Sequence, residues 1–410
     1  MTRPLPVDQA LALVLQATPV LPAEEVPSAE SLGRVLQQEV RAGHDYPEFD
    51  KALMDGYAVA AAELKETPRL LRVLEEIPAG RDPAGLRRLE PGTASRIMTG
   101  APIPPGADAV LIIEETEEVP GEPGSIRVRG TVRPGENLAR RGADVPRGEV
   151  LLAPGDFIGP GEIGVLAACG RTRVRVGGRP RLAVLATGDE LVDPGQDPGP
   201  GRIRNSNGPM LAALARRAGA EAGPAGIVRD DEAALRAAIE RGLEGDALVL
   251  SGGVSMGRYD LVAQALRAAG VEILFDRVAI KPGRPFTFGR RGPALVFGCP
   301  GNPASAYVIF QIFARAALRK MIGFRDPAAR PLRGTLRNPL RQRPGRAGYH
   351  QAVVRWDGSR YAVEILPTSG SADFVSCARG NALAILPAET ASLDAGETVD
   401  VILLDDDADR

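Results

Sequence analysis

Residues 181–187 read RLAVLAT, a short run of β-forming residues that ends in the polar turn Gly188-Asp189-Glu190. A helical pattern follows over residues 208–218, then an apolar run at 225–231 (AGIVRDD) and a second helix to about residue 241. Residues 246–250 (DALVL) form the next predicted strand, which opens into SGGVSMG at 251–257. Strands that are apolar on both faces and alternate with helices predict a parallel sheet covered by helices on both sides.

The same alternation continues to residue 323. A helix is predicted over residues 259–269, and strands are predicted over 271–278 and 294–297. Asn205 or Asn207 could cap the helix at 208–218, and Asn302 is expected to cap a long apolar helix that begins at Pro303 and stops at Gly323. These elements predict a central doubly wound α/β domain at residues 177–326.

Glycines and acidic residues occupy the loops that follow the predicted strands. In sheets of this kind, ligands bind where the carboxyl ends of the strands open into loops. Glycine lets backbone amides approach phosphate oxygens, and carboxylates are ligands that Mg²⁺ uses. The pattern therefore predicts a site for a phosphate-bearing ligand with Mg²⁺, although each acid alone could be an ordinary cap or turn residue. The acids are Asp189, Glu190, Asp230, Asp231 and Asp260.

Length and composition limit the possible classes of protein. A chain of 410 residues with 44% hydrophobic and 25% charged residues predicts a soluble protein of three or four domains. The formal net charge of −2 argues against a nucleic-acid partner held by bulk electrostatics. Lysine occurs only at positions 51, 65, 281 and 320, so that Lys281 is an unusual choice in an arginine-rich chain.

Cysteine usage and hydropathy exclude further classes. Three distant cysteines form neither a disulfide framework nor metal-ligand spacing, and with only two histidines a zinc site or a Cys-His catalytic pair is not expected. Residues 7–17 predict an amphipathic helix that packs on the protein rather than a signal peptide. Since no apolar run reaches about 18 residues, no membrane span is predicted and a cytoplasmic protein is expected.

The regions outside the central domain predict three more parts. A second helical segment is expected at residues 28–36, and residues 1–45 with 141–176 predict an elongated, helical and extended N-terminal domain. Residues 46–140 predict an inserted β-rich domain with strands at 70–77, 96–100, 109–119 and 125–132. Residues 327–410 contain five short β-like runs, at 333–340, 349–356, 360–367, 381–387 and 397–404, which predict a C-terminal β-barrel or sandwich.

Two further sets of polar residues are candidates for binding. Asp55 and Thr99 each precede a glycine beside a β-like run, which is also the pattern of an ordinary turn. The adjacent Arg140 and Arg141 could bind phosphate or form a solvated pair.

Taken together, eight motifs resemble one family, the MoeA/gephyrin-type molybdopterin molybdotransferases, over roughly residues 5–405. The motifs occur in the order and with spacing similar to those of the family. They are ALMDGYAV (52–59), RIMTGAPIPPGAD (96–108), RRGAD (140–144), LATGDEL (185–191), IVRDD (227–231), LVLSGGVSMGRYD (248–260), AIKPGRPFTFG (279–289) and GCPGNPASA (298–306).

The resemblance implies an α/β multidomain protein of four parts, with a MogA-like central domain, that works as a homodimer. It also implies the activity: molybdate is inserted into adenylated molybdopterin, and the adenylate is cleaved with the help of Mg²⁺ to give molybdenum cofactor and AMP. A molybdopterin adenylyltransferase and apo molybdoenzymes are the protein partners that it implies.

The resemblance also implies roles for individual residues. The predicted metal ligands are Glu190, Asp230 and Asp260. The predicted catalytic residues are Asp55, Thr99, Asp144, Asp260, Lys281, Arg284 and Ser371. The predicted substrate-binding residues are Arg141, Gly252, Gly253, Ser255, Lys281, Pro300, Gly301, Asn302 and Arg346. Arg284 stands where the family often has lysine, which keeps the charge but changes its geometry.

Two other functions remain as alternatives. A molybdopterin adenylyltransferase would resemble residues 178–325 alone and favours a Thr-Gly-Gly-Thr-Gly loop, whereas this chain has Ser-Gly-Gly-Val-Ser at 251–255. A non-catalytic scaffold, as in the gephyrin relatives, is the second alternative.

Overall fold

The computed structural model describes residues 3–223, 226–253 and 261–404. The chain forms two compact units. The larger unit consists of Met1–Gln38, Pro154–Gly164 and Thr172–Arg410, and the smaller one of Glu39–Ala153 and Val165–Arg171.

A seven-stranded sheet forms the centre of the larger unit. Its order is β16-β13-β18-β22-β21-β19, and β17 also pairs with β13. The strands are β13 (Arg181–Thr187), β16 (Glu221–Ala222), β17 (Gly226–Val228), β18 (Ala247–Ser251), β19 (Glu272–Arg277), β21 (Pro285–Arg291) and β22 (Ala294–Cys299). The strands predicted at 181–187, 246–250, 271–278 and 294–297 are therefore present.

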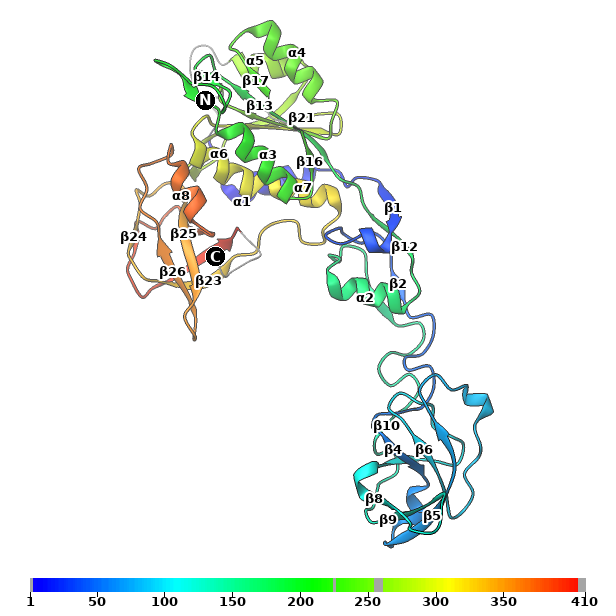
Figure 1. Cartoon of the computed structure of the whole chain (residues 1–410). Coiled ribbons are helices and arrows are strands. Elements are labelled where there is room, and N and C mark those ends of the chain that lie inside the picture. Colours follow the sequence, from blue (N-terminus) through cyan, green and yellow to red (C-terminus); the bar gives the residue numbers. More distant parts are fainter. Residues whose placement is uncertain (1–2, 224–225, 254–260, 405–410) are drawn as a thin grey trace. The chain divides into compact units, whose positions relative to one another are not determined.

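Helices cover both faces of this sheet, as the apolar strands predicted (Figure 1). Along β18, Ala247 and Val249 belong to one core, while Leu248 and Leu250 belong to the other. This alternation follows from the two-residue period of a strand. The first core includes α1 (Val7–Ala17), α3 (Asn207–Arg217) and a long helix made of α6 (Pro303–Ile309), the π-helical η5 (Phe310–Ala314) and α7 (Arg315–Ile322). The second includes α4 (Glu232–Gly242) and α5 (Leu261–Ala268).

The sheet differs from a purely parallel one at β21, which is antiparallel to both β22 and β19. Residues 278–284 join β19 to β21, and residues 292–293 join β21 to β22. Such short links reverse the chain, because a parallel pair needs a crossover of a dozen or more residues.

The C-terminal region is a closed five-stranded barrel, which confirms the barrel alternative. Its order is β25-β26-β23-β29-β27, and β27 pairs back to β25. Each of the five predicted runs supplies one strand: β23 (Leu332–Leu336), β25 (Ala347–Trp356), β26 (Tyr361–Ile365), β27 (Ala382–Leu386) and β29 (Thr398–Leu403). The short β20 (Ile280–Lys281) adds to β25 in parallel, with Lys281 opposite Gly348.

The N-terminal part is less helical than predicted. The helix over residues 7–17 is confirmed as α1, but the predicted helix at 28–36 is wrong, because only the 3₁₀ turn η1 (Ser28–Glu30) forms there. Gly33 has φ +76°, which a helix does not allow, and Val35 and Leu36 form β-bridges instead. Before this turn, β1 (Ala23–Pro27) pairs with β12 (Arg173–Gly177).

The smaller unit contains a six-stranded sheet in the order β7-β4-β6-β5-β9-β8. Its strands are β4 (Gly56–Val59), β5 (Arg69–Ile77), β6 (Thr93–Ile97), β7 (Ala109–Ile112), β8 (Thr116–Glu118) and β9 (Ser125–Val128). The run predicted at 109–119 is two strands, because the 3₁₀ turn η4 (Ile113–Glu115) interrupts it.

Short elements complete the two units. The helices are α2 (Pro160–Ala168) and α8 (Phe374–Arg379), and the 3₁₀ turns are η2 (Ala61–Leu64) and η3 (Pro83–Gly85). Four pairs of short strands also form. They are β2 (Val40–Arg41) with β11 (Val150–Leu152), β3 (Lys51–Ala52) with β10 (Leu138–Ala139), β14 (Leu191–Val192) with β15 (Ile203–Arg204), and β24 (Leu340–Arg341) with β28 (Ser392–Leu393). In the described part of the chain, no helix combines the length and the apolar character needed to cross a membrane.

Candidate functional site

One edge of the central sheet collects most of the residues predicted for the larger unit. β13, β16, β17, β18 and β22 are parallel, so their carboxyl ends lie at the same edge. β19 is parallel to β22, because β21 is antiparallel to both. The turn at 278–284 therefore lies at this edge too, together with the loops that begin at residues 188, 229, 252 and 300. We call this edge the carboxyl edge.

Acidic side chains crowd one part of the carboxyl edge. The backbone amide of Asp230 donates to Asp189 Oδ1 at 3.3 Å. Burial raises the pKa of Asp230, and the charges of Asp189 and Glu190 raise it further. A cation bound there would relieve this repulsion, and carboxylate oxygens suit Mg²⁺. Asp231 is an ordinary cap, since its side chain accepts from Ala234 N at the start of α4.

The metal-ligand set of Glu190, Asp230 and Asp260 stays a prediction. Among the residues that the structure describes, no group of three His, Cys, Asp or Glu side chains could hold a metal ion. Asp260, the third predicted ligand, lies outside those residues, as does Ser255.

The backbone at Gly252 and Gly253 has a shape that only glycine fits. Their φ angles are +97° and +66°. A Cβ on Gly252 would lie 2.4 Å from the backbone oxygen of Thr187, and one on Gly253 would lie 2.4 Å from Cγ2 of Val262. The two glycines therefore let this loop pack closely against the end of β13 and against α5.

The floor of this edge is formed by Asn207, Ser251 and Thr187, none of which was predicted as a site residue. Asn207, in the first turn of α3, donates from Nδ2 to Ser251 Oγ at 2.8 Å and to the carbonyl of Gly301 at 2.7 Å. Asn207 therefore ties the ends of β18 and β22 to α3, while Asn205 takes the capping role by accepting from Gly208 N at 2.9 Å. The sequence did contain a signal for this role. Asn205 is enough to cap α3, so the second asparagine, Asn207, was available for another contact.

This floor has unused hydrogen-bonding capacity. Asn207 Oδ1 and Thr187 Oγ1 are buried and have no hydrogen-bond partner within the described ranges. Thr187 is 3% exposed and Asn207 8% exposed. Buried polar atoms are usually satisfied, so these two oxygens favour a ligand or water that donates hydrogen bonds at the carboxyl edge.

Asn302 and Ser371 meet, although 69 residues separate them. Asn302 Nδ2 donates to Ser371 Oγ at 2.8 Å, and the carbonyl of Ser371 accepts from Ala304 N at 3.1 Å. Asn302 is the N-cap residue of α6, as predicted, but its side chain forms no cap hydrogen bond. Pro303 is the first residue of α6, as predicted. The barrel thus contributes a hydroxyl to the loop after β22, where Pro300 is buried and Gly301 exposed.

The two cations of the 278–284 turn have different surroundings. Lys281 is half-buried in β20 beside the barrel strand β25. Arg284 instead lines a pocket of about 1090 Å³ that Arg346 also lines and Lys281 does not. This pocket therefore brings Arg284 together with Arg346 rather than with Lys281.

The half-buried His350 lies in β25, two residues after Gly348, which pairs with Lys281. Burial, followed by the charge of Lys281, lowers the pKa of His350 to about 4. Its Nε2 has no hydrogen-bond partner among the residues described. The imidazole is therefore neutral at pH 7, and it adds no positive charge beside Lys281.

The burial of the His350 ring should make the free energy of unfolding depend on pH. The unfolded chain binds a proton at His350 near pH 6.5, but the folded chain does so only near pH 4, so the free energy of unfolding falls as the pH drops through this window. The loss from this group is up to about 3 kcal/mol. We expect His350→Gln to remove that part of the loss in urea unfolding at pH 7 and pH 4.5. His44→Gln, at an exposed site, is the control, and equal pH dependence in both variants would contradict the assignment.

In the smaller unit, Asp55 and Thr99 lie together. Asp55 Oδ1 accepts from Thr99 N and from Thr99 Oγ1, both at 2.7 Å. These two hydrogen bonds lower the pKa of Asp55, which keeps an exposed carboxylate ionised and fixed in position.

The RRGAD segment of the smaller unit is held by acids. Arg140 donates to Asp50 at 2.7 Å, and Arg141 Nε donates to Asp45 at 2.7 Å. The sequence left two alternatives for these arginines, a phosphate site or a solvated pair. In the structure, each guanidinium group has a carboxylate partner instead. Asp144 is exposed, and its backbone amide donates to the carbonyl of Tyr46 at 3.0 Å.

Comparison with known proteins covers the whole chain. Family models match it in three successive regions: the MoeA N-terminal region (domain I and II) over residues 5–170, a probable molybdopterin binding domain over 183–320, and the MoeA C-terminal region (domain IV) over 333–404. The molybdopterin molybdenumtransferases of Staphylococcus aureus strains MRSA252 and Mu50 / ATCC 700699 are 32% identical to it over 410 residues, which cover 99% of this chain and 97% of each relative.

Solved structures agree over the same length. A crystal structure of the molybdopterin biosynthesis MoeA protein from Pyrococcus horikoshii OT3 has a TM-score of 0.84 at 29% identity and covers 98% of this chain and 100% of its own. A second MoeA structure, from Pyrococcus horikosii, has a TM-score of 0.81 at 30% identity, with the same coverage. The chain therefore belongs to the MoeA family, as its eight motifs predicted.

Proposed function

We propose that the protein is a molybdopterin molybdotransferase, which inserts molybdate into adenylated molybdopterin and cleaves the adenylate with Mg²⁺ to give molybdenum cofactor and AMP. The observation that carries this proposal is the 32% identity to molybdopterin molybdenumtransferases along 99% of the chain. The carboxyl edge supports it, because acids, glycine amides and a lysine gather there around a strand-end site.

The acidic part of the edge is suited to Mg²⁺. Glu190 and Asp230 would hold the ion, with Asp260 as the third predicted ligand. Burial, and then the charges of Asp189 and Glu190, raise the pKa of Asp230, and a bound cation would oppose both effects. When bound, Mg²⁺ neutralises charge on phosphate oxygens.

Other groups of the edge would bind and orient the substrate. The amide of Gly253 would donate to a phosphate oxygen, whereas Gly252 N already donates to the carbonyl of Cys299 at 3.2 Å. Lys281 supplies a positive charge for the charge that develops on the bridging oxygen as the anhydride is cleaved. Asn302 and Ser371 hold each other in place by their 2.8 Å hydrogen bond and present a hydroxyl and an amide beside Gly301.

The remaining predicted roles belong to the same proposal. Asp55, Thr99, Arg141 and Asp144 of the smaller unit and Arg284 and Arg346 of the larger one would bind substrate or act in catalysis. A homodimer of four-domain protomers in the cytoplasm, which receives its substrate from an adenylyltransferase and delivers its product to apo molybdoenzymes, completes it.

A reconstitution assay tests the proposal. The purified protein, supplied with Mg²⁺, molybdate and adenylated molybdopterin, is expected to release AMP and to activate an apo molybdoenzyme. Omission of either molybdate or Mg²⁺ should reduce the amounts of AMP released and of molybdoenzyme activated. No AMP and no activation in the complete mixture would refute the function.

The same preparation distinguishes the adenylyltransferase alternative. With ATP and molybdopterin in place of the adenylated substrate, accumulation of the adenylate would favour that enzyme. The family matches outside residues 183–320 argue against it, because an adenylyltransferase would resemble the central domain alone.

A further inference from the structure

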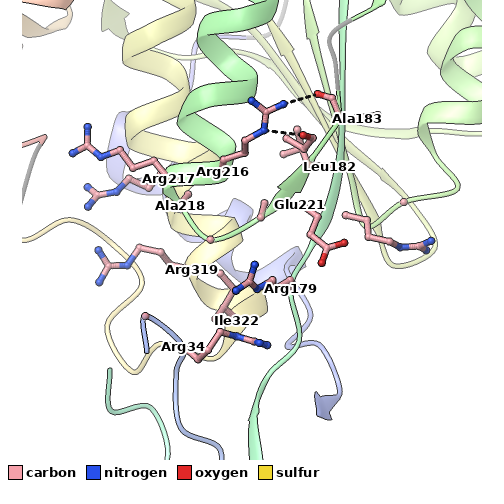
Figure 2. Close-up of a pocket in the computed structure, with 18 of the residues that line it drawn as sticks. Arg34, Arg179, Leu182, Ala183, Arg216, Arg217, Ala218, Glu221, Arg319 and Ile322 are labelled. Atoms are coloured by element: carbon pink, nitrogen blue, oxygen red, sulfur yellow. Dashed lines mark hydrogen bonds between the residues drawn. The ribbon is translucent and has the colours of Figure 1, made fainter. Parts of the chain in front are cut away.

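A second, basic pocket lies at the opposite edge of the central sheet. It has a volume of about 1350 Å³ and is lined by eight arginines and two acids, Glu221 and Glu244 (Figure 2). Its lining includes Arg181, the first residue of β13, and Gly245, which precedes β18, so it lies where these strands begin. The seven residues of β13 separate it from the carboxyl edge by about 20 Å.

Some of these arginines have structural partners. Arg34 forms an ion pair with Glu24 and donates to the carbonyl of Gly177 at 2.6 Å. Arg181 donates to the carbonyl of Glu244 at 3.0 Å and lies 4.0 Å from Asp246. These two charges are therefore offset by carboxylates.

Other arginines of the pocket keep an unbalanced charge. Arg216 Nε donates to the carbonyl of Ala222 at 2.9 Å, which leaves the guanidinium without an anionic partner among the described residues (Figure 2). The guanidinium groups of Arg179 and Arg241 have no hydrogen-bond or ion-pair partner among the described residues, and both residues are exposed. The pocket thus concentrates positive charge in a chain whose formal net charge is −2.

Helix capping explains only part of this arrangement. Arg216 lies in the last turn of α3 and Arg241 in the last turn of α4, where basic side chains interact favourably with the helix dipole. Arg179 belongs to neither helix, since it lies between β12 and β13. Helix capping also does not account for one concave site that both helix ends and Arg179 line together.

We propose that this pocket binds an anion with two or more phosphate groups. Guanidinium groups on separate elements surround one concavity, so several anionic groups on one ligand would each find a cation, and phosphate accepts two hydrogen bonds from a guanidinium. This site is separate from the carboxyl edge and does not depend on the proposed activity.

The rim of the pocket adds an aromatic surface. The rings of Phe157 and Phe324 stack with centroids 6.1 Å apart, and the guanidinium of Arg319 lies 4.2 Å from the centroid of Phe324. Phe157 is 52% exposed. A nucleoside oligophosphate and an inorganic oligophosphate share the phosphate chemistry, but only the first has a base to place on this surface.

Calorimetric titration with inorganic tripolyphosphate, in EDTA and low salt, tests the proposal. We expect Arg179→Gln/Arg241→Gln to weaken binding about tenfold or more, because two charge-assisted contacts are lost. The control Arg333→Gln/Arg341→Gln removes the same charge at positions of the C-terminal region whose side chains are 83% and 75% exposed. It should bind like the wild type, and so should Lys281→Met, which alters only the carboxyl edge.

Equal affinity in the pocket variant and the wild type, or an equal loss in the control variant, would overturn the proposal. The melting temperature without ligand supplies a second readout. We expect the pocket variant to melt no lower than the wild type, since like charges are removed, whereas a capping role predicts a lower value. A lower melting temperature with unchanged binding would therefore assign the arginines to capping and refute the site.

ATP identifies the source of the phosphate groups. Tighter binding of ATP than of tripolyphosphate, with the difference lost in Phe157→Ala, would support a nucleotide ligand. Equal binding of both would support recognition by phosphate alone. Insensitivity of both ligands to the Arg179 and Arg241 substitutions would contradict the site.

Discussion

Replacement of Lys281 by methionine is expected to lower the rate of AMP release about 10²- to 10³-fold, the effect of removing one group that stabilises developing charge. Methionine keeps the length of the side chain but removes its charge. Lys281 is half-buried in β20, at the edge where the acids and glycines gather, and the neighbouring His350 is neutral. No imidazolium is therefore available to replace the lost charge.

Two controls separate charge from structure. Lys281→Arg keeps the charge and should retain more activity than Lys281→Met, while Lys65→Met, at an exposed position of the smaller unit, should be fully active. The pKa of His350 gives a readout besides activity, because Lys281 contributes to lowering it. In Lys281→Met that pKa should rise but stay below 6.5, since burial is the larger cause, and NMR can follow it in a chain with two histidines. Full turnover in Lys281→Met would exclude the lysine from the mechanism.

Replacement of Gly252 by alanine is expected to destabilise the larger unit by about 3 kcal/mol or more and to abolish AMP release. The φ of +97° is unfavourable for alanine. In addition, its Cβ would lie 2.4 Å from the carbonyl oxygen of Thr187, so the ends of β13 and β18 would have to separate. Urea unfolding and thermal melting measure the loss.

Gly301→Ala is the matched control on the neighbouring strand end. A Cβ there would meet only Gly252 Cα, at 3.6 Å, which is an ordinary van der Waals distance. We expect this variant to unfold at nearly the wild-type urea concentration. If both alanine variants were equally stable, the close approach of Gly252 to β13 would not be a constraint on the fold.

Local patterns predicted most of the elements correctly. The helix at 7–17, the central strands and the five barrel runs all form. The spacing of apolar residues over five to ten positions determines whether a helix or a strand can bury their side chains on one face. The failures occur where distant segments decide. Residues 28–36 have a helical pattern, but Gly33 interrupts it and Leu36 bridges to Val176 instead. β21 likewise runs antiparallel to β19 and β22 because the segments that join it to them are short, and its own residues do not determine this direction.

The motifs identified the family and many candidate residues without a structure. Acids and glycines at successive strand ends pointed to the carboxyl edge, because strand order in a wound sheet brings these ends together. The sequence by itself thus determined the class of fold, the family and the edge at which ligands would bind.

Only the tertiary structure decided which side chains touch. Asn302 bonds to Ser371, and Asn207 bonds to Ser251 and Gly301, across 44 to 94 residues of sequence. The basic pocket likewise draws its arginines from separate helices, strands and loops. Such contacts depend on how helices dock on the sheet and how the barrel meets it, and no local periodicity encodes distances between segments so far apart in the chain.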